Sequence, residues 1–221
     1  MACKHCFKEA AKSNIRCIDQ DLNRSFNIKR NMPKNHETKL AKKVLRQCKA
    51  DVLLDVHTHS NPERFALISE NNYPKLARLV GGLNLKSIII IPPHVTGKRS
   101  LIENVDCSVS IETGEHNSLE AGCFAKASVY RVLKYLSNQY IYEKDTPLLK
   151  AREFIYNNTN REITLPQNVK NFLPLQAGRI ITSSVTIAED CIPILISPRA
   201  KPKEKIFLSC EPFGGEKYEK I

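Results

Sequence analysis

The chain has 221 residues, of which 42% are hydrophobic and 26% are charged, and its formal net charge is +11. These values are ordinary for a globular protein with one core, or with one core and a small appendage. No apolar run approaches the roughly 18 residues of a membrane helix, so we expect no membrane-spanning helix and no membrane partner. The eight cysteines are scattered and no secretory signal is visible, so we expect free thiols in the cytoplasm.

The excess of basic residues is greatest from Lys29 to Lys49, much of it on a predicted helix. A solvated helix face accounts for such a run. The chain has no tryptophan, no aromatic residues interleaved with the basic ones and no nucleic-acid-binding motif. We therefore expect no specific nucleic-acid partner, although the charge is compatible with non-specific binding at low salt. A basic surface also suits an anionic small substrate.

Strand and helix patterns alternate along the first two thirds of the chain. Apolar residues recur at helical spacing from Glu37 to Lys49, and a β-branched strand that ends in two histidines lies within Ala50 to Ser60. Further strands are predicted at 64–69, 87–93 and 107–112, and further helices at 73–83 and 118–138. This alternation predicts an α/β fold.

The pattern changes near residue 144. Seven prolines punctuate the rest of the chain, and the apolar runs between them are short and β-like. Strands are predicted at 152–156, 179–183, 192–196 and 206–208. We therefore predict an α/β domain over residues 1–143 and a small β-rich domain over residues 144–221.

Two strands end in side chains that suit hydrolytic chemistry. The first strand ends in Val-His-Thr-His, and alternation along a strand places His57 and His59 on the same side. The other delivers Glu112 to a loop that contains a glycine. Ligands bind beyond the carboxyl ends of strands in open α/β sheets, and a metal-assisted hydrolase needs a histidine ligand and a carboxylate base. A satisfied core histidine and a surface glutamate explain the same residues, and spacing alone does not exclude that alternative.

Three motifs resemble those of the aspartoacylase and succinylglutamate desuccinylase family. Residues 16–26 read Arg-Cys-Ile-Asp-Gln-Asp-Leu-Asn-Arg-Ser-Phe, residues 54–58 read Leu-Asp-Val-His-Thr, and residues 109–114 read Val-Ser-Ile-Glu-Thr-Gly. The likeness is good over residues 8–125 and loose beyond them. It implies a zinc-carboxypeptidase-like mixed sheet flanked by helices. It also implies a zinc-dependent deacylase that cleaves the amide bond of a small anionic N-acyl amino acid, such as an N-acyl aspartate or glutamate.

The resemblance implies a role for each matching residue. His57 matches a zinc ligand, and Glu112 matches the base that deprotonates the metal-bound water and then protonates the leaving amine. Arg16 matches the arginine that stabilises the oxyanion. Residues that hold the substrate carboxylate are matched by Asn23, Arg24 and Arg99. Arginine forks bind carboxylates through two hydrogen bonds, which suits these roles; salt bridges to nearby aspartates are the structural alternative.

The chain departs from the family pattern at its start. The family takes its first two zinc ligands from a Gly-x-His-Gly-x-Glu loop, and no His-x-x-Glu pair precedes Asp21. We favour the interpretation that the sequence begins too late and that the complete protein is an ordinary enzyme. A catalytically inactive relative that binds anionic metabolites without zinc is the main alternative. The third is a rebuilt metal site, for which the candidates beside His57 are Cys3, His5, Cys6 and His59. The sequence gives no indication of the oligomeric state.

Overall fold

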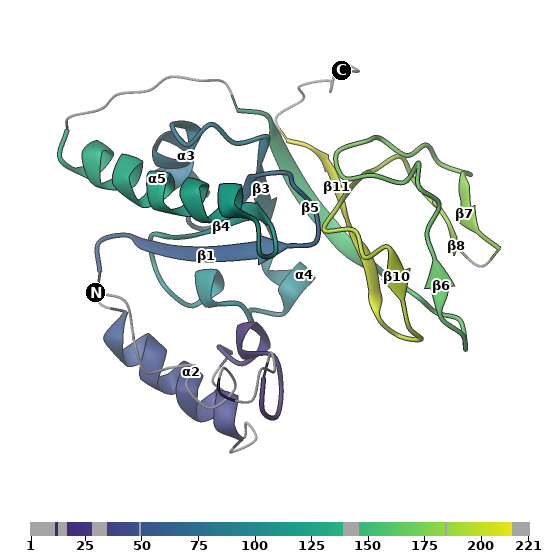
Figure 1. Ribbon diagram of the computed structural model, residues 1–221, viewed down its shortest axis with the longest axis horizontal. Helices are drawn as coiled ribbons and strands as arrows, with labels where there is room; N and C mark the ends of the chain where they lie inside the picture. Colours follow the sequence, from purple (N-terminus) through teal and green to yellow (C-terminus); the bar gives the residue numbers. More distant parts are fainter. Residues whose placement is uncertain are drawn as a thin grey trace.

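The computed structural model describes residues 12, 17–27, 35–48, 50–138, 146–183 and 185–213. Within that part of the chain, the centre of the molecule is a seven-stranded sheet (Figure 1). Its strands, in order across the sheet, are β1 (Leu53–His59), β4 (Ser108–Glu115), β2 (Phe65–Ser69), β3 (Ser87–Ile91), β5 (Leu148–Tyr156), β11 (Lys205–Pro212) and β9 (Ile192–Ile194).

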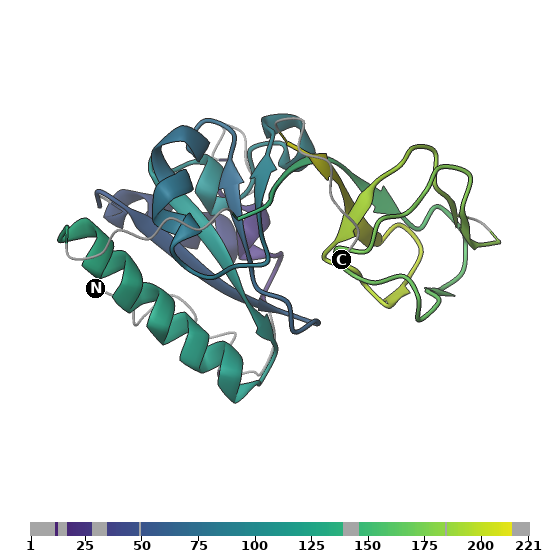
Figure 2. The same cartoon turned by 90° about the horizontal axis from the view of Figure 1, so that it is seen from above.

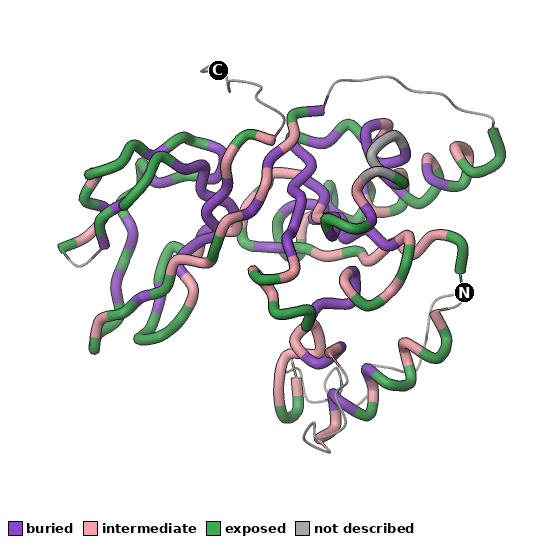
Figure 3. Tube along the Cα trace, turned by 180° about the vertical axis from the view of Figure 1, so that it is seen from behind, coloured by how far each residue is buried: buried purple, intermediate pink, exposed green. Residues whose placement is uncertain are grey.

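The sheet is mixed. β1 and β4 are parallel, β4 and β2 are antiparallel, and β2, β3 and β5 are parallel to one another. β11 then pairs antiparallel with both β5 and β9. Strand β3 is buried along its whole length, as its unbroken apolar run predicts for a strand covered on both faces. In Figure 3 the buried residues, drawn in purple, gather in the middle of the molecule. The mixed sheet with flanking helices confirms the α/β prediction.

Two helices, α3 (Tyr73–Gly81) and α5 (Leu119–Leu136), pack their apolar residues on one face of the sheet. The Oγ of Ser118 accepts a hydrogen bond from the backbone N–H of Ala121 and so caps the start of α5. Figure 2 shows α5 lying along one side of the sheet. The core formed there includes Ile68, Leu79, Leu83, Val109, Ile111, Phe124 and Val132.

A second, smaller core lies around α2 (His36–Gln47) and two 3₁₀ turns, η1 (Leu22–Arg24) and η2 (Leu101–Glu103). Phe26, Ala41 and Leu101 are buried in it. The short helix α4 (Pro93–Thr96) follows β3 and ends at Gly97, whose φ of 65° is the left-handed conformation that favours glycine. In this core the Asp-Leu-Asn-Arg motif packs beside the loop that carries Arg99.

The β-rich part of the chain is built on β5 and β11, which also belong to the main sheet. It adds two small pairs, β6 (Ile163–Thr164) with β10 (Arg199–Ala200) and β7 (Ile180–Thr182) with β8 (Val185–Thr186). These pairs enclose their own apolar core, and no helix occurs in the described residues 146–213. A domain boundary between residues 143 and 144 remains a prediction. None of the described helices is long and apolar enough to cross a membrane.

The predicted elements are found with ends shifted by a few residues. The clearest correction concerns the strand that carries Glu112, which was expected to end at that residue. β4 continues to Glu115, because His59 of β1 pairs with that residue. Gly114 makes the continuation possible: its φ is 119°, and a Cβ there would lie 3.3 Å from the carbonyl oxygen of Pro62. Glu112 therefore lies inside a strand and is held more rigidly than a loop residue.

Candidate active site

His57 and Glu112 are paired in the parallel register of β1 and β4. Because side chains alternate along a strand, Asp55 and His57 share one face of β1, next to Glu112 on β4. Thr113 fixes the two strands in this register, since its Oγ1 donates a hydrogen bond of 2.9 Å to the carbonyl oxygen of His57. The sheet thus brings together the histidine and the glutamate that the sequence predicts for the site.

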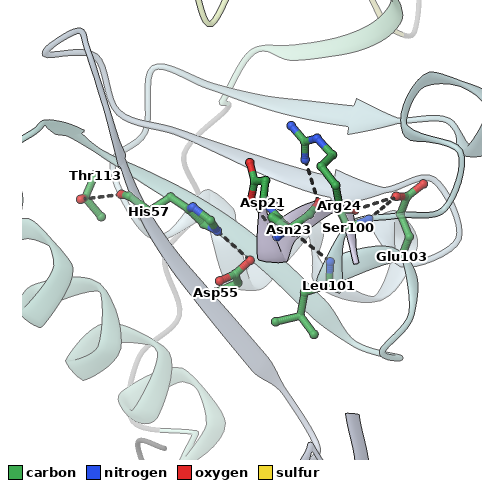
Figure 4. Close-up of polar contacts among 9 residues, drawn as sticks. All are labelled: Asp21, Asn23, Arg24, Asp55, His57, Ser100, Leu101, Glu103 and Thr113. Carbon is green, nitrogen blue, oxygen red and sulfur yellow. Dashed lines mark hydrogen bonds and ion pairs between the residues drawn. The ribbon is translucent and has the colours of Figure 1, made fainter. Parts of the chain in front are cut away.

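A carboxylate on the same strand holds His57. Its Nε2 donates to Oδ2 of Asp55 at 2.9 Å, and Figure 4 shows this contact beside η1. Burial opposes the charged imidazole, but the hydrogen bond and charge of Asp55, with the charges of Glu112 and Asp21, raise the pKa of His57. Because the Asp55 carboxylate holds Nε2, the orientation of the His57 ring is fixed, and so is the direction in which Nδ1 points. Histidine ligands of metals usually have this arrangement.

Glu112 is a buried carboxylate with an uncommitted oxygen. The residue is 6% exposed, and its Oε2 has no hydrogen-bond partner among the described residues. Burial raises the pKa of Glu112, and the nearby charges of His57 and His59 offset only part of this effect. A carboxylate with a raised pKa is a stronger base, and so it is better suited to accept a proton from water.

His59 lies deeper than His57 and has a structural contact. Its Nε2 donates to the carbonyl oxygen of Glu63 at 2.9 Å, and its ring packs on Phe65 with 5.1 Å between the centroids. Nδ1 is buried and has no partner in the described part of the chain. The expected common side of His57 and His59 assumes regular alternation, and a register shift between the two residues interrupts it.

The Asp-Leu-Asn-Arg motif forms η1, which lies beside His57 (Figure 4). Asp21 caps this turn, because its Oδ1 accepts the backbone N–H of Asn23 at 2.9 Å. Its charge also acts on His57. The guanidinium of Arg24 donates through Nη1 to the carbonyl oxygen of Asn23 at 2.8 Å. The predicted substrate-binding residues Asn23 and Arg24 are therefore close to His57, the predicted zinc ligand.

The loop that carries Arg99 is fastened to the same motif. The backbone N–H of Leu101 donates to Oδ1 of Asn23 at 3.1 Å, and the N–H of Phe26 donates to the carbonyl oxygen of Arg99 at 3.2 Å. The side-chain amide of Asn27 reaches the carbonyl oxygen of Gly97 at 2.9 Å. Asn23 thus uses its side-chain oxygen for structure, and this contact brings the segments of Arg24 and Arg99 together.

Glu37 organises the approach to the motif, and the sequence did not single it out. The residue is 3% exposed, and its carboxylate accepts the backbone N–H groups of Ile18, Asp19 and Gln20 at 2.6, 3.1 and 3.3 Å. Burial by itself favours the protonated form, but these hydrogen bonds hold the pKa of Glu37 below its usual range. A basic helix with a solvated face gives no sequence signal for such a buried acid.

The predicted oxyanion residue, Arg16, lies outside the described residues, as do Cys3, His5 and Cys6. Zinc is the cofactor that the motifs imply, and catalytic zinc needs three protein ligands. Among the described residues, no group of three or more His, Cys, Asp or Glu side chains is arranged to hold a metal. His57 has the orientation of a ligand, but the described residues alone do not fit a zinc site.

No protein-family model and no curated protein sequence matches the chain. Its three-dimensional structure, in contrast, has the fold of succinylglutamate desuccinylase and aspartoacylase structures, as the motifs led us to expect. Succinylglutamate desuccinylase from Chromobacterium violaceum superposes with a TM-score of 0.68 and 17% identity, over 92% of this chain and 70% of that one.

Two further solved structures show the same likeness. For murine aminoacylase 3 the TM-score is 0.67 and the identity 18%, over 92% of this chain and 80% of that one. The product-bound ectoine utilization protein from Ruegeria pomeroyi gives 0.67 and 14%, over 92% of this chain and 72% of that one. At these identities the likeness establishes the fold, and the activity depends on the side chains.

Proposed function

We propose that the protein is a deacylase that hydrolyses the amide bond of a small N-acyl amino acid. The observation that carries this proposal is the uncommitted Oε2 of buried Glu112 beside His57, on strands to which the arginine-bearing η1 is packed. Desuccinylases and an aminoacylase with the same fold act on acylated amino acids according to their names, which supports the reaction class.

Glu112 is the general base in this proposal. Its free oxygen takes a proton from the attacking water, and the same carboxyl then gives the proton to the leaving amine. The raised pKa of Glu112, caused by burial, suits both halves of this transfer. Thr113 and Asp55 position Glu112 and His57, because Thr113 fixes the strand register and Asp55 fixes the ring of His57.

Arg24 and Arg99 bind the substrate carboxylate in this proposal, and Asn23 assists by holding the two segments together. Arginine is suited to this task because its planar fork donates two parallel hydrogen bonds to a carboxylate. Arg16 remains the predicted oxyanion-stabilising residue. Removal of Arg24 or Arg99 is expected to weaken substrate binding more than it alters the fold, whereas removal of Arg16 is expected to abolish turnover.

The dependence of this activity on zinc is a separate part of the proposal and needs its own test. His57 is the proposed ligand, and the remaining ligands are not supplied by the described residues. Elemental analysis of the purified chain decides between the interpretations. About one zinc per chain indicates a complete site, and substitution of Cys3, His5, Cys6 and His59 then tells which residues build it. Absence of bound zinc in a chain that still hydrolyses substrate contradicts the cofactor prediction.

The direct test of the proposed function is to incubate the protein with a panel of N-acetyl and N-succinyl amino acids and to measure the free amino acid that is released. We expect activity on acidic members of the panel, and none in a Glu112→Ala variant. Full activity of that variant, or no hydrolysis of any member by a zinc-loaded chain, refutes the deacylase proposal.

A binding protein for anionic metabolites is the second candidate. It is favoured by the lack of a three-ligand metal group among the described residues. This candidate predicts tight binding of N-acyl amino acids without turnover. Calorimetric binding in a chain that releases no amino acid is the result that selects it over the enzyme.

A further inference from the structure

The loop that joins β1 to β2, residues 60–64, is fastened to both strands of the candidate active site. A Cβ added to Gly114 of β4 would lie 3.3 Å from the carbonyl oxygen of Pro62, so the loop backbone rests directly on β4, two residues beyond the proposed base. At the end of β1, Nε2 of His59 donates to the carbonyl oxygen of Glu63 at 2.9 Å. A displacement of this loop is therefore transmitted to β1 and β4.

Asn171 of the β-rich part holds the other side of the loop. It is 8% exposed, and its Nδ2 donates to Oε2 of Glu63 at 3.4 Å. Its Oδ1 accepts the backbone N–H of Ile196 at 3.1 Å, in a buried hydrogen bond. The side-chain amide of Asn61 also reaches the carbonyl oxygen of Ile196, at 3.5 Å. Asn171 therefore ties the loop to the segment that follows β9.

The backbone on both sides of the Asn171 contact is strained. Phe172 and Leu195 have φ of 62° and 57°, a left-handed conformation that bulky residues rarely adopt. Such residues cost free energy and persist only where their surroundings hold them. The ring of Phe172 packs edge-on against Phe65 of β2, with 5.6 Å between the centroids. Phe65 is the partner of Glu112 in the register of β2 and β4, so the strained segment reaches the strand beside the proposed base.

We propose that Asn171 is a positioning residue for Glu112 and acts through the loop 60–64. The inference rests on the proposed function, in which Glu112 is the general base. Asn171 fixes the loop, the loop backbone rests on Gly114, and the end of β4 stays paired with β1. Without the Asn171 contact the loop and the end of β4 shift together, and the carboxyl of Glu112 loses its fixed place. The competing explanation is that Asn171 only stabilises the β-rich part.

Asn171→Asp tests the proposal because it removes one of the two side-chain contacts. At about pH 8 the new carboxylate still accepts the N–H of Ile196, but it cannot donate to Glu63 and repels its charge. We expect kcat to fall about tenfold or more while KM stays within about twofold, because the arginines that bind the substrate lie on other segments. Kinetics are measured well below the melting temperature, so that unfolded protein does not contribute to the loss.

A second substitution shows whether the contact with Glu63 is responsible. Glu63→Gln places an amide opposite the new carboxylate, so the double variant of Asn171→Asp and Glu63→Gln restores the hydrogen bond with donor and acceptor exchanged. We expect its kcat to return to within about threefold of wild type. A double variant that stays as slow as Asn171→Asp overturns the proposal.

Asn157→Asp is the matched control. Asn157 is also a buried amide of the β-rich part, and its Nδ2 donates to the carbonyl oxygens of Arg161 and Ala200 at 2.9 and 2.8 Å. These contacts stay within the β-rich part. The variant is expected to lower the melting temperature, while kcat of the folded protein stays within about twofold of wild type. An equal loss of kcat in Asn157→Asp and Asn171→Asp shows a general effect of destabilisation and overturns the proposal.

Hydrogen exchange, followed by mass spectrometry, gives a readout that needs no hydrolysis. The backbone N–H of His116 donates to the carbonyl oxygen of His59 at 3.0 Å and so closes the end of β4 against β1. We expect exchange of residues 113–116 to accelerate about tenfold or more in Asn171→Asp, and to stay near wild type in Asn157→Asp and in the double variant. This pattern in a protein that cleaves no N-acyl amino acid refutes the proposed function alone. Unchanged exchange in Asn171→Asp refutes this inference alone, whether or not the protein is active.

Discussion

His57 of β1 and Glu112 of β4 are directly paired across two parallel strands, with their register secured by the Thr113 hydroxyl. The pairing places an imidazole whose pKa is raised by nearby carboxylates beside a carboxyl whose pKa is raised by burial. Each group stabilises the charged form of the other, while burial opposes both charges. The proton distribution within this pair is therefore sensitive to substitution of either residue or of its partners.

Glu112→Gln is expected to lower kcat by about 100-fold or more, because a neutral amide cannot accept a proton from water. The amide is close in shape to the carboxyl, so substrate affinity and thermal stability should stay near those of the wild type. Steady-state kinetics and thermal unfolding measure both effects. Glu115→Gln, at an exposed position of the same strand, is the control and should leave kcat unchanged. Comparable losses in the two variants contradict a role specific to Glu112.

Arg24→Ala is expected to raise KM about tenfold or more with a small change in kcat, because the arginine holds a part of the substrate that does not react. Its guanidinium contacts only the neighbouring carbonyl oxygen of Asn23 among the described hydrogen bonds, so little stability should be lost. Arg46→Ala, on the exposed side of α2, removes the same charge far from the motif and should leave KM unchanged. A fall in kcat at constant KM contradicts the assignment.

Asp55→Asn is expected to lower the pKa of His57. Burial already favours the neutral imidazole, and the variant removes the largest of the effects that raise the pKa, the Asp55 hydrogen bond and charge. NMR titration of the His57 ring measures this directly. Asp51→Asn, at an exposed position before the strand, is the control and should shift the pKa less. An unchanged or increased His57 pKa in Asp55→Asn contradicts the geometry.

Glu37→Gln is expected to reduce the free energy of unfolding by about 1–3 kcal/mol, because an amide offers only one oxygen to three backbone N–H groups. The pKa of Glu37 is lowered in the folded state. Its stabilising contribution is therefore complete above the unfolded-state pKa of about 4.3 and is lost as the pH falls through the lower, folded-state pKa.

Denaturant unfolding between pH 3 and 7 measures this contribution. The difference in stability between wild type and Glu37→Gln should shrink toward acid pH. Glu162→Gln, at an exposed position, serves as the control and should unfold like the wild type. A Glu37→Gln difference that grows as the pH falls has the wrong sign and contradicts the hydrogen-bond pattern.

Gly114→Ala is expected to destabilise the fold by about 1–3 kcal/mol, since φ is 119° and the added Cβ meets the carbonyl oxygen of Pro62 at 3.3 Å. The strain should also displace Glu112 and lower kcat. Gly122→Ala is the matched control on α5, where no atom lies within 4 Å of the new Cβ and alanine favours the helix. Thermal unfolding should therefore show opposite signs for the two variants, and equal signs contradict the backbone argument.

The sequence by itself determined the elements and the order of the motifs. Apolar periodicity is local, so the helix from Leu119 and the strand from Ser87 were predicted with small errors at their ends. The α/β class follows from the alternation of these elements. The motifs that contain Asn23, His57 and Glu112 were found by their resemblance to a known family, and each can be read from the sequence because it is a short contiguous run.

Only the tertiary structure decided which side chains meet. The continuation of β4 past Glu112 depends on its pairing with β1, and local pattern carries no information about that partner. The buried carboxylate of Glu37 arises because its helix packs on a loop of backbone donors. Contacts between segments so far apart in sequence depend on strand order and burial, which exist only in the folded chain.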